Sequence, residues 1–170
     1  MKTLIVYFTK YGATKVCAKR IAEGIKGEVN LINIKEQPDV SIQDYDNIVI
    51  GCSVYAGMLN KRIKSFCTVQ SEQLKNKRVF LFLSCMDQTQ LDEYVKANLP
   101  EVLTRQLLAK VSCGGAFYFT KMNFFEKFII KAITNSKKQQ AGQTLSVDTK
   151  KDMEMFDDAK IQELINRINE

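Results

Sequence analysis

Two threonines and a glycine stand close together near the start of the chain, in the segment TKYGAT over residues 9–14. The segment follows an apolar run, residues 2–8, and precedes a stretch with helical spacing of apolar side chains. The first N–H groups of a helix have no partner within it, and the helix dipole is positive there. Gly12 permits a turn that directs N–H groups inward, and threonines add hydroxyl donors. These features predict a phosphate-binding loop formed by Thr9, Lys10, Tyr11, Gly12, Ala13 and Thr14.

The same segment also has an ordinary structural interpretation, in which Thr14 caps a helix and Gly12 makes a turn. It matches neither GxxxxGK(S/T) nor GxGxxG, so a diphosphate held by a glycine-rich loop is not expected. A phosphate monoester fits the segment better.

Two further segments that follow apolar runs carry groups suited to a flat ring. SVYAG, over residues 53–57, sets the aromatic Tyr55 among small residues, so that a planar ring could stack on it. A surface turn is the alternative for this segment. SCMD, over residues 84–87, offers small and soft side chains but predicts little by itself. The expected ring-binding residues are Ser53, Val54, Tyr55, Ala56, Gly57, Ser84, Cys85, Met86 and Asp87.

The composition excludes several kinds of catalytic site. The chain has no histidine, which excludes Ser-His-Asp and Cys-His triads and imidazole metal ligands. Its five cysteines are widely spaced and form no CxxC pair, so neither a disulfide framework nor a metal site is predicted. We therefore expect the chemistry to come from a cofactor or from carboxylates, and no catalytic side chain is assigned.

Near-continuous apolar runs alternate with amphipathic stretches along the chain, which predicts an α/β fold with a parallel sheet covered on both faces. We expect a doubly wound five-stranded sheet of order 2-1-3-4-5, in which ligands bind at the carboxyl ends of strands one and three. A response-regulator receiver shares this topology but needs an acidic pair where this chain has Phe8, Thr9 and Lys10. No linker is visible, so residues 1–170 are predicted as one domain, with a helical insertion at about 120–148 before the last helix. The predicted strands are residues 2–8, 29–34, 47–52, 78–85 and 110–119.

The overall charge and the chain ends bear on partners and location. The net charge of +6 and the pI near 9.0 favour an anionic partner, but no nucleic-acid recognition motif accompanies them, so nucleic acid is not expected. No run reaches the roughly 18 apolar residues of a membrane span, and the N-terminus lacks a signal-peptide pattern. A cytoplasmic protein is predicted.

The segment 121–138 combines apolar and basic residues. As a helix it would present a broad apolar face with a narrow, mainly basic stripe. Such a face either lies in an anionic membrane interface, as a peripheral contact on the inner side of the cell membrane, or packs onto the sheet while the lysines face water. The apolar face would hold Phe124, Phe125, Phe128, Ile129, Ile130, Ala132 and Ile133, and the stripe Lys127, Lys131, Thr134 and Lys138.

Taken together, these segments resemble those of the flavodoxin superfamily. TKYGAT resembles the T-x-(T/Y)-G-x-T phosphate loop of flavodoxins, and VIGCSVYAG over residues 49–57 resembles their second flavin-binding loop. The resemblance covers essentially the whole chain and implies FMN as the cofactor. It implies that Thr9–Thr14 hold the phosphate, that Ser53–Gly57 run along the isoalloxazine, and that Ser84–Asp87 close its other side. Tyr118 is a further, less direct candidate.

The segment GGAFYFTKMNFFEKFIIKAITNSKK, over residues 114–138, is similar to that of flavodoxin-like, menaquinone-dependent protoporphyrinogen oxidases. This similarity implies an FMN-dependent oxidoreductase that oxidises protoporphyrinogen IX in haem biosynthesis and passes the electrons to a quinone. Ala56–Leu59 are less polar and basic than in that group, and the absence of histidine also departs from it. A flavodoxin-like electron carrier or quinone reductase stays an alternative, as does a regulatory or scaffold protein that binds no flavin.

The expected flavin loops are poor in acidic residues, with Asp87 as the single exception. Negative charge near the ring disfavours an anionic reduced flavin, so this chain is expected to disfavour it less than acidic flavodoxins do. Two-electron exchange with a porphyrinogen or a quinone is therefore favoured over service as an acidic carrier.

Overall fold

The structure, a computed structural model, describes residues 1–85, 88–130, 148 and 150–170. It contains two compact units, one of residues 1–115 with 155–170 and one of residues 116–154. The single domain over residues 1–170 stays a prediction. Several residues singled out above lie outside the described ranges, namely Met86, Asp87, Lys131, Ala132, Ile133, Thr134 and Lys138.

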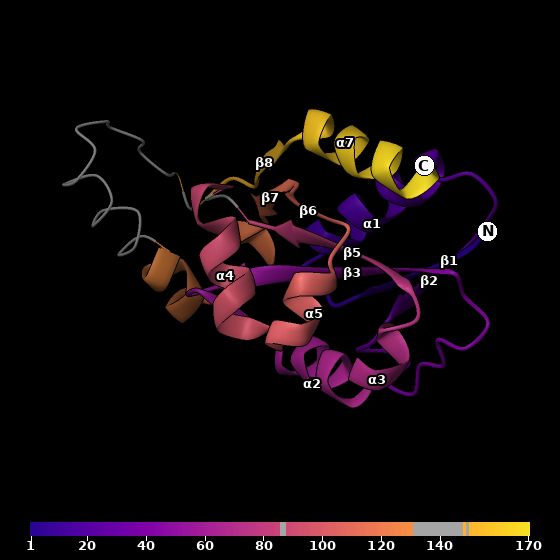
Figure 1. The fold of residues 1–170 in the computed structure, drawn as a ribbon. Coiled ribbons are helices and arrows are strands. Elements are labelled where there is room, and N and C mark those ends of the chain that lie inside the picture. Colours follow the sequence, from indigo (N-terminus) through magenta and orange to yellow (C-terminus); the bar gives the residue numbers. More distant parts are fainter. Residues whose placement is uncertain (86–87, 131–147, 149) are drawn as a thin grey trace. The chain divides into compact units, whose positions relative to one another are not determined.

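A parallel sheet forms the centre of the first unit, with the strand order β2-β1-β3-β5-β6 (Figure 1). The short β4 pairs antiparallel with β3 and lies off this path. Without β4 the order is the predicted 2-1-3-4-5, so the predicted α/β flavodoxin-like fold is confirmed. The strands are β1 (Lys2–Tyr7), β2 (Glu28–Asn33), β3 (Asn47–Tyr55), β4 (Met58–Leu59), β5 (Arg78–Ser84) and β6 (Ala109–Ser112).

Helices cover both faces of this sheet, as Figure 1 shows. Side chains alternate along each strand, so Ile48 and Ile50 enter the core on one face while Val49 enters the core on the other. The 3-10 turn η1 (Gln88–Gln90) precedes α4. One face carries α1 (Ala13–Gly24) and α7 (Asp158–Asn169), and the other carries α2 (Lys61–Val69), α3 (Ser71–Leu74), α4 (Leu91–Asn98) and α5 (Glu101–Gln106).

The predicted strand over residues 110–119 is wrong in its second half. β6 ends at Ser112, and the chain then forms β7 (Gly114–Phe117), which pairs with β8 (Met153–Phe156) in a separate two-stranded sheet. Gly114 has φ +66°, and a Cβ there would lie 2.0 Å from the carbonyl oxygen of Met155. Only glycine allows this turn and this close approach, so the strand breaks here.

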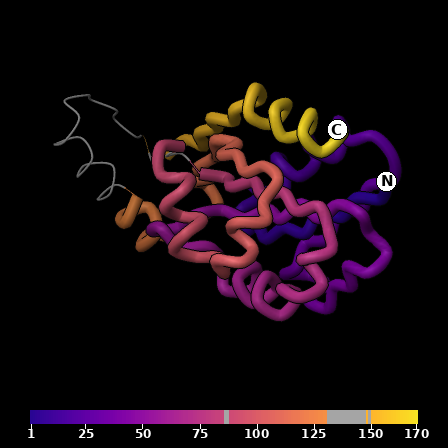
Figure 2. Tube along the Cα trace, in the orientation of Figure 1, coloured from indigo at the N-terminus to yellow at the C-terminus, as the bar shows by residue number. Residues whose placement is uncertain are grey.

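Both chain ends lie on the same side of the first unit, as Figure 2 shows. The Arg78 guanidinium links them, since Nη1 lies 3.3 Å from both Met1 Sδ and the Ile168 carbonyl oxygen.

The second unit holds η2 (Phe119–Lys121) and a helical stretch at residues 124–130. Its hydrogen bonds join residues near the two ends of the segment. The Tyr118 hydroxyl donates to Glu154 at 2.7 Å, and the backbone N–H and hydroxyl of Thr120 both donate to Asp152 at 2.9 Å. Within the described ranges, no helix is long and apolar enough to cross a membrane.

Candidate functional site

The segment over residues 9–14 joins β1 to α1 and places Gly12 at the N-cap of the helix. Gly12 has φ 117°, a conformation that other residues rarely adopt, and its N–H donates to Thr9 Oγ1 at 3.0 Å. Across the described part of the chain, no side chain caps α1. The first N–H groups of an α-helix have no acceptor within the helix, so this end of α1 is suited to an anion.

Thr14 lies fully buried in the first turn of α1. Its Oγ1 finds no hydrogen-bond partner among the residues that the structure describes. An unpartnered buried hydroxyl costs about 1–3 kcal/mol, so an acceptor brought by a ligand would remove a real penalty. The ordinary interpretation of Thr14 as the N-cap is wrong, because the cap is Gly12.

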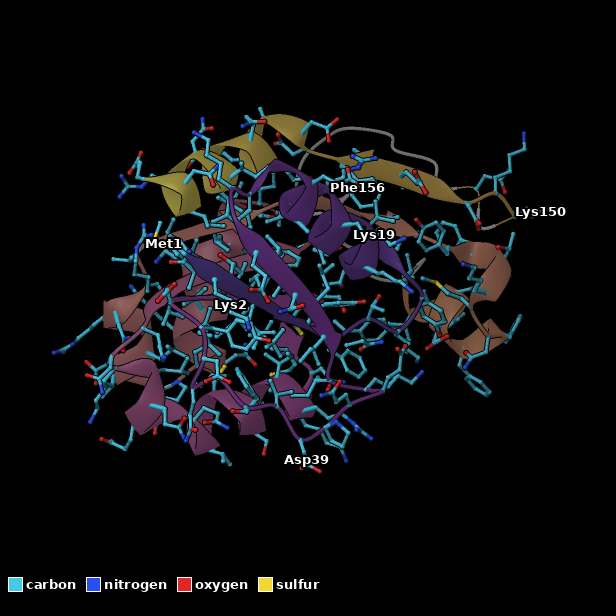
Figure 3. The ribbon with its side chains drawn as sticks, turned by 90° about the vertical axis from the view of Figure 1, so that its right-hand side faces the viewer. Met1, Lys2, Lys19, Asp39, Lys150 and Phe156 are labelled. Atoms are coloured by element: carbon cyan, nitrogen blue, oxygen red, sulfur yellow. The ribbon has the colours of Figure 1, made fainter. Side chains whose placement is uncertain are left out.

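Basic residues flank this loop, and the first turn of α1 contains no acidic residue. Lys10 is exposed, with Nζ 5.1 Å from the centre of the Tyr11 ring. Lys15 and Lys19, the latter labelled in Figure 3, are exposed as well. The local charge therefore favours an anion at the helix terminus.

The segment over residues 53–57 is a hairpin, where the sequence predicts a loop. β3 continues to Tyr55, and Tyr55 pairs with Met58 across a two-residue turn. Ala56 and Gly57 have φ 49° and 79°, the positive values that such a turn needs. Ala56 is the one non-glycine residue with positive φ in the described ranges, and the Tyr55 side chain at the turn is 42% exposed.

Asn98, at the end of α4, holds this hairpin, and the sequence did not reveal it. Its Nδ2 donates to the carbonyl oxygens of Gly57 and Tyr94, both at 2.9 Å, and its Oδ1 accepts from the Leu59 N–H at 3.1 Å. The side chain is 8% exposed, so these bonds are shielded from water. The sequence shows only an asparagine before Leu99 and Pro100, with no sign of a partner 39 residues away.

Cys52 lies beneath the hairpin and is fully buried. Its thiol donates to the Ser53 carbonyl oxygen at 3.3 Å and accepts from the Asn60 N–H at 3.4 Å. Burial raises the pKa of the Cys52 thiol to about 11. It therefore stays protonated at neutral pH and acts as a hydrogen-bonding core residue.

The third segment begins where β5 ends. Ser84 and Cys85 are both buried, and the Cys85 carbonyl oxygen accepts from Ser112 Oγ at 3.1 Å. Met86 and Asp87 fall outside the described ranges. The described part of this segment is thus a buried strand end whose polar groups bond to β6.

The strand register brings the three segments to one edge of the sheet. The Phe8 N–H donates to the Gly51 carbonyl oxygen at 3.0 Å, and Ser53 lies opposite Ser84 in the register of β3 and β5. The three segments therefore leave neighbouring strands at similar levels, as the doubly wound order predicts. Tyr118, the further candidate, belongs to the second unit.

A hollow of about 660 Å³ lies elsewhere on the first unit, between residues 38–43 and α2. None of its lining residues belongs to the three segments. The hollow is therefore separate from the three segments.

Comparisons with known proteins agree with this architecture. The chain is 24% identical to protoporphyrinogen IX dehydrogenase (quinone) of Escherichia coli strain K12, over 90% of this chain and 86% of that protein. It is 23% identical to a protein of the same name from Leishmania major, over 78% of this chain but only 62% of the relative's length. The solution structure of two-electron reduced Megasphaera elsdenii flavodoxin superposes with a TM-score of 0.51 at 20% identity, covering 65% of this chain and 84% of that one.

A family model described as flavodoxin domain matches residues 4–144. The match includes β1 to β6 and the three segments at the carboxyl edge of the sheet. Because it spans well over half of the chain, the protein belongs to the flavodoxin domain family.

Proposed function

We propose that the protein binds FMN non-covalently and is an oxidoreductase that oxidises protoporphyrinogen IX and passes the electrons to a quinone. The observation that carries the proposal is the buried Thr14 hydroxyl, which has no partner among the described residues, at the start of α1, which no described side chain caps. It supports a phosphate group bound there. The names of the Escherichia coli and Leishmania relatives support the porphyrinogen and the quinone.

The proposal gives each segment a task. Thr9–Thr14 bind the phosphate through N–H groups and the Thr14 hydroxyl, with Lys10 adding positive charge. The hairpin over residues 53–57 presents Tyr55 and backbone groups to the ring. Asn98 orders this hairpin before any ligand arrives, which lowers the entropic cost of binding.

FMN, when bound, supplies two-electron redox chemistry at its ring. The chain's own contribution is to bind the cofactor and set the charge around it. Asp87 is the single acidic residue of the three segments, so they bring little negative charge to the proposed ring site. No side chain is assigned as a proton carrier.

The test is an absorption spectrum of the purified protein after FMN is added and the excess removed. We expect a yellow protein with one FMN per chain. Gly12→Val should abolish retention, because valine does not adopt φ 117°. The matched control Thr68→Val changes an exposed helical threonine of α2 and should retain the flavin.

A second experiment tests the proposed substrate separately from the cofactor. Under anaerobic conditions, protoporphyrinogen IX should bleach the flavin, and added menaquinone should restore the colour. Retained FMN with no bleaching would favour an electron carrier or a reductase with another donor. A protein that stays colourless would favour a regulatory or scaffold role and contradict the proposal.

A further inference from the structure

The helix at residues 124–130 has the opposite burial pattern to an amphipathic surface helix, in which apolar side chains face the core and charged side chains face water. Its large apolar side chains face outward, while the acidic Glu126 is 7% exposed. Surface helices normally turn their apolar side to the core, and glutamate is rarely buried. Ile130, predicted on the apolar face, is buried four residues after Glu126 instead. The exposed fractions are 79% for Phe124, 77% for Phe125, 65% for Phe128 and 42% for Ile129.

A reciprocal cap forms the start of this helix. The Glu126 N–H donates to Asn123 Oδ1 at 2.9 Å, and the Asn123 N–H donates to Glu126 Oε2 at 3.1 Å. This is the capping-box arrangement, which satisfies two N–H groups at the start of a helix. Glu126 and Ile130 are one turn apart on the buried side of the helix, and residues 124, 125, 128 and 129 are exposed on its other side. The exposed apolar side chains thus lie on a helix whose first turn is well formed.

The charge near Phe124, Phe125, Phe128 and Ile129 indicates which kind of surface could cover them. Residues 121–138 include five lysines and one acidic residue, Glu126. In the structure, Lys121 and Lys127 are near enough to help lower the pKa of Asp152, after the hydrogen bonds from Thr120. A second copy of the chain would bring like charges together, whereas an anionic surface would attract them.

We propose that Phe124, Phe125, Phe128 and Ile129 form a membrane-docking face that inserts into the interface of a bilayer containing anionic lipids. Aromatic and aliphatic side chains enter the boundary between headgroups and acyl chains, and Lys121 and Lys127 contact the headgroups. The face contains no flavin-binding residue. Docking therefore does not depend on the proposed cofactor or substrate, and either can fail without the other.

The test is flotation of the full chain with vesicles of phosphatidylcholine containing phosphatidylglycerol. We expect the unchanged protein to float with them, and less of it to float at high salt or with phosphatidylcholine alone. Phe124→Ser with Phe128→Ser should lower the partition coefficient by on the order of 10- to 100-fold, because two large apolar side chains no longer enter the bilayer. Both changes are at exposed positions, and circular dichroism should show an unaltered fold.

Val69→Ser with Val102→Ser is the matched control, because these aliphatic side chains are 75% and 56% exposed on the first unit. This variant should float as the unchanged protein does. No binding by the unchanged protein, equal binding by the phenylalanine variant, or equal loss in the control would overturn the proposal. So would equal binding to phosphatidylcholine alone, or a dimer that the phenylalanine changes dissociate.

Discussion

The loops that follow β1 and β3 leave the same edge of the sheet, yet they are held in different ways. The hairpin after β3 is tied to α4 through Asn98, which satisfies one carbonyl and one N–H of the hairpin. In the loop after β1, the Gly12 N–H donates to Thr9 Oγ1, and the buried Thr14 hydroxyl has no partner among the described residues. The hairpin is held by a side chain of the protein itself, whereas the first loop contains a buried hydroxyl to which a ligand can bond.

This difference separates two tasks that a cofactor site must perform. A rigid hairpin keeps its shape before the ligand arrives, so little ordering entropy is lost on binding. A buried hydroxyl without a partner lowers the stability of the free protein. A ligand that forms the missing hydrogen bond removes this penalty, which strengthens binding. Changes in the hairpin should therefore act mainly on folding, and changes at Thr14 mainly on binding.

The largest effect is expected for Asn98→Ala. Removing the amide leaves the Leu59 N–H and the Gly57 carbonyl without their partner in a buried position, which should lower the free energy of unfolding by about 2–5 kcal/mol. Asn169→Ala is the control, because the Asn169 side chain makes two hydrogen bonds to backbone groups, against three for Asn98, and lies nearer to solvent. Urea unfolding of both variants measures the difference, and equal losses would contradict the role given to Asn98.

A smaller effect is expected from the Cys52 thiol at high pH. The pKa of about 11 in the folded protein exceeds the ordinary value of 9.0, so only the unfolded chain ionises between these values. The contribution to stability is complete below pH 9 and is lost as the pH rises toward 11, by about 2–3 kcal/mol in total. Cys52→Ala should show a correspondingly flatter decline of unfolding free energy over this range. Thr14→Val should decline as the unchanged protein does, and a common slope for all three would refute this expectation.

The smallest change in the free energy of unfolding is expected for Thr14→Val. Its direction, an increase, distinguishes a ligand-binding hydroxyl from one that only packs. Without FMN, the variant should be more stable by about 1 kcal/mol, because it removes a buried hydroxyl that has no partner. With FMN, its affinity should fall about tenfold or more, because a hydrogen bond to the charged phosphate is lost. Thermal unfolding and FMN titration measure the two effects, with Thr14→Ser as the variant that keeps the hydroxyl. A less stable variant with unchanged affinity would show that Thr14 only packs.

Features encoded in short stretches of sequence could be predicted. The apolar runs that form β1 and β5 are local patterns, and both strands appear in the structure close to where the sequence predicts them. The glycine and threonines of residues 9–14 are local as well, so the position of the first loop followed from sequence.

Features that depend on distant partners could not be predicted. Asn98 acts on backbone groups about 40 residues away, and such a contact leaves no periodic pattern. The break at Gly114 depends on the close approach of Met155, which lies about 40 residues further along the chain. Phe124 and Phe128 are exposed while Glu126 and Ile130 are buried on the opposite side of the helix, and composition alone does not reveal this pattern.

The close approach of Gly114 and Met155 also determines where the chain can change without disturbing the sheet. The chain leaves the first unit just after Gly114 and returns at Met155, and the Asp157 N–H donates to the Cys113 carbonyl oxygen at 3.0 Å. Exit and return are therefore neighbours, so the segment between them can lengthen, shorten or be exchanged while the sheet keeps its register. A segment with another surface can thus replace residues 116–154 without altering the strand edge that carries the candidate cofactor site.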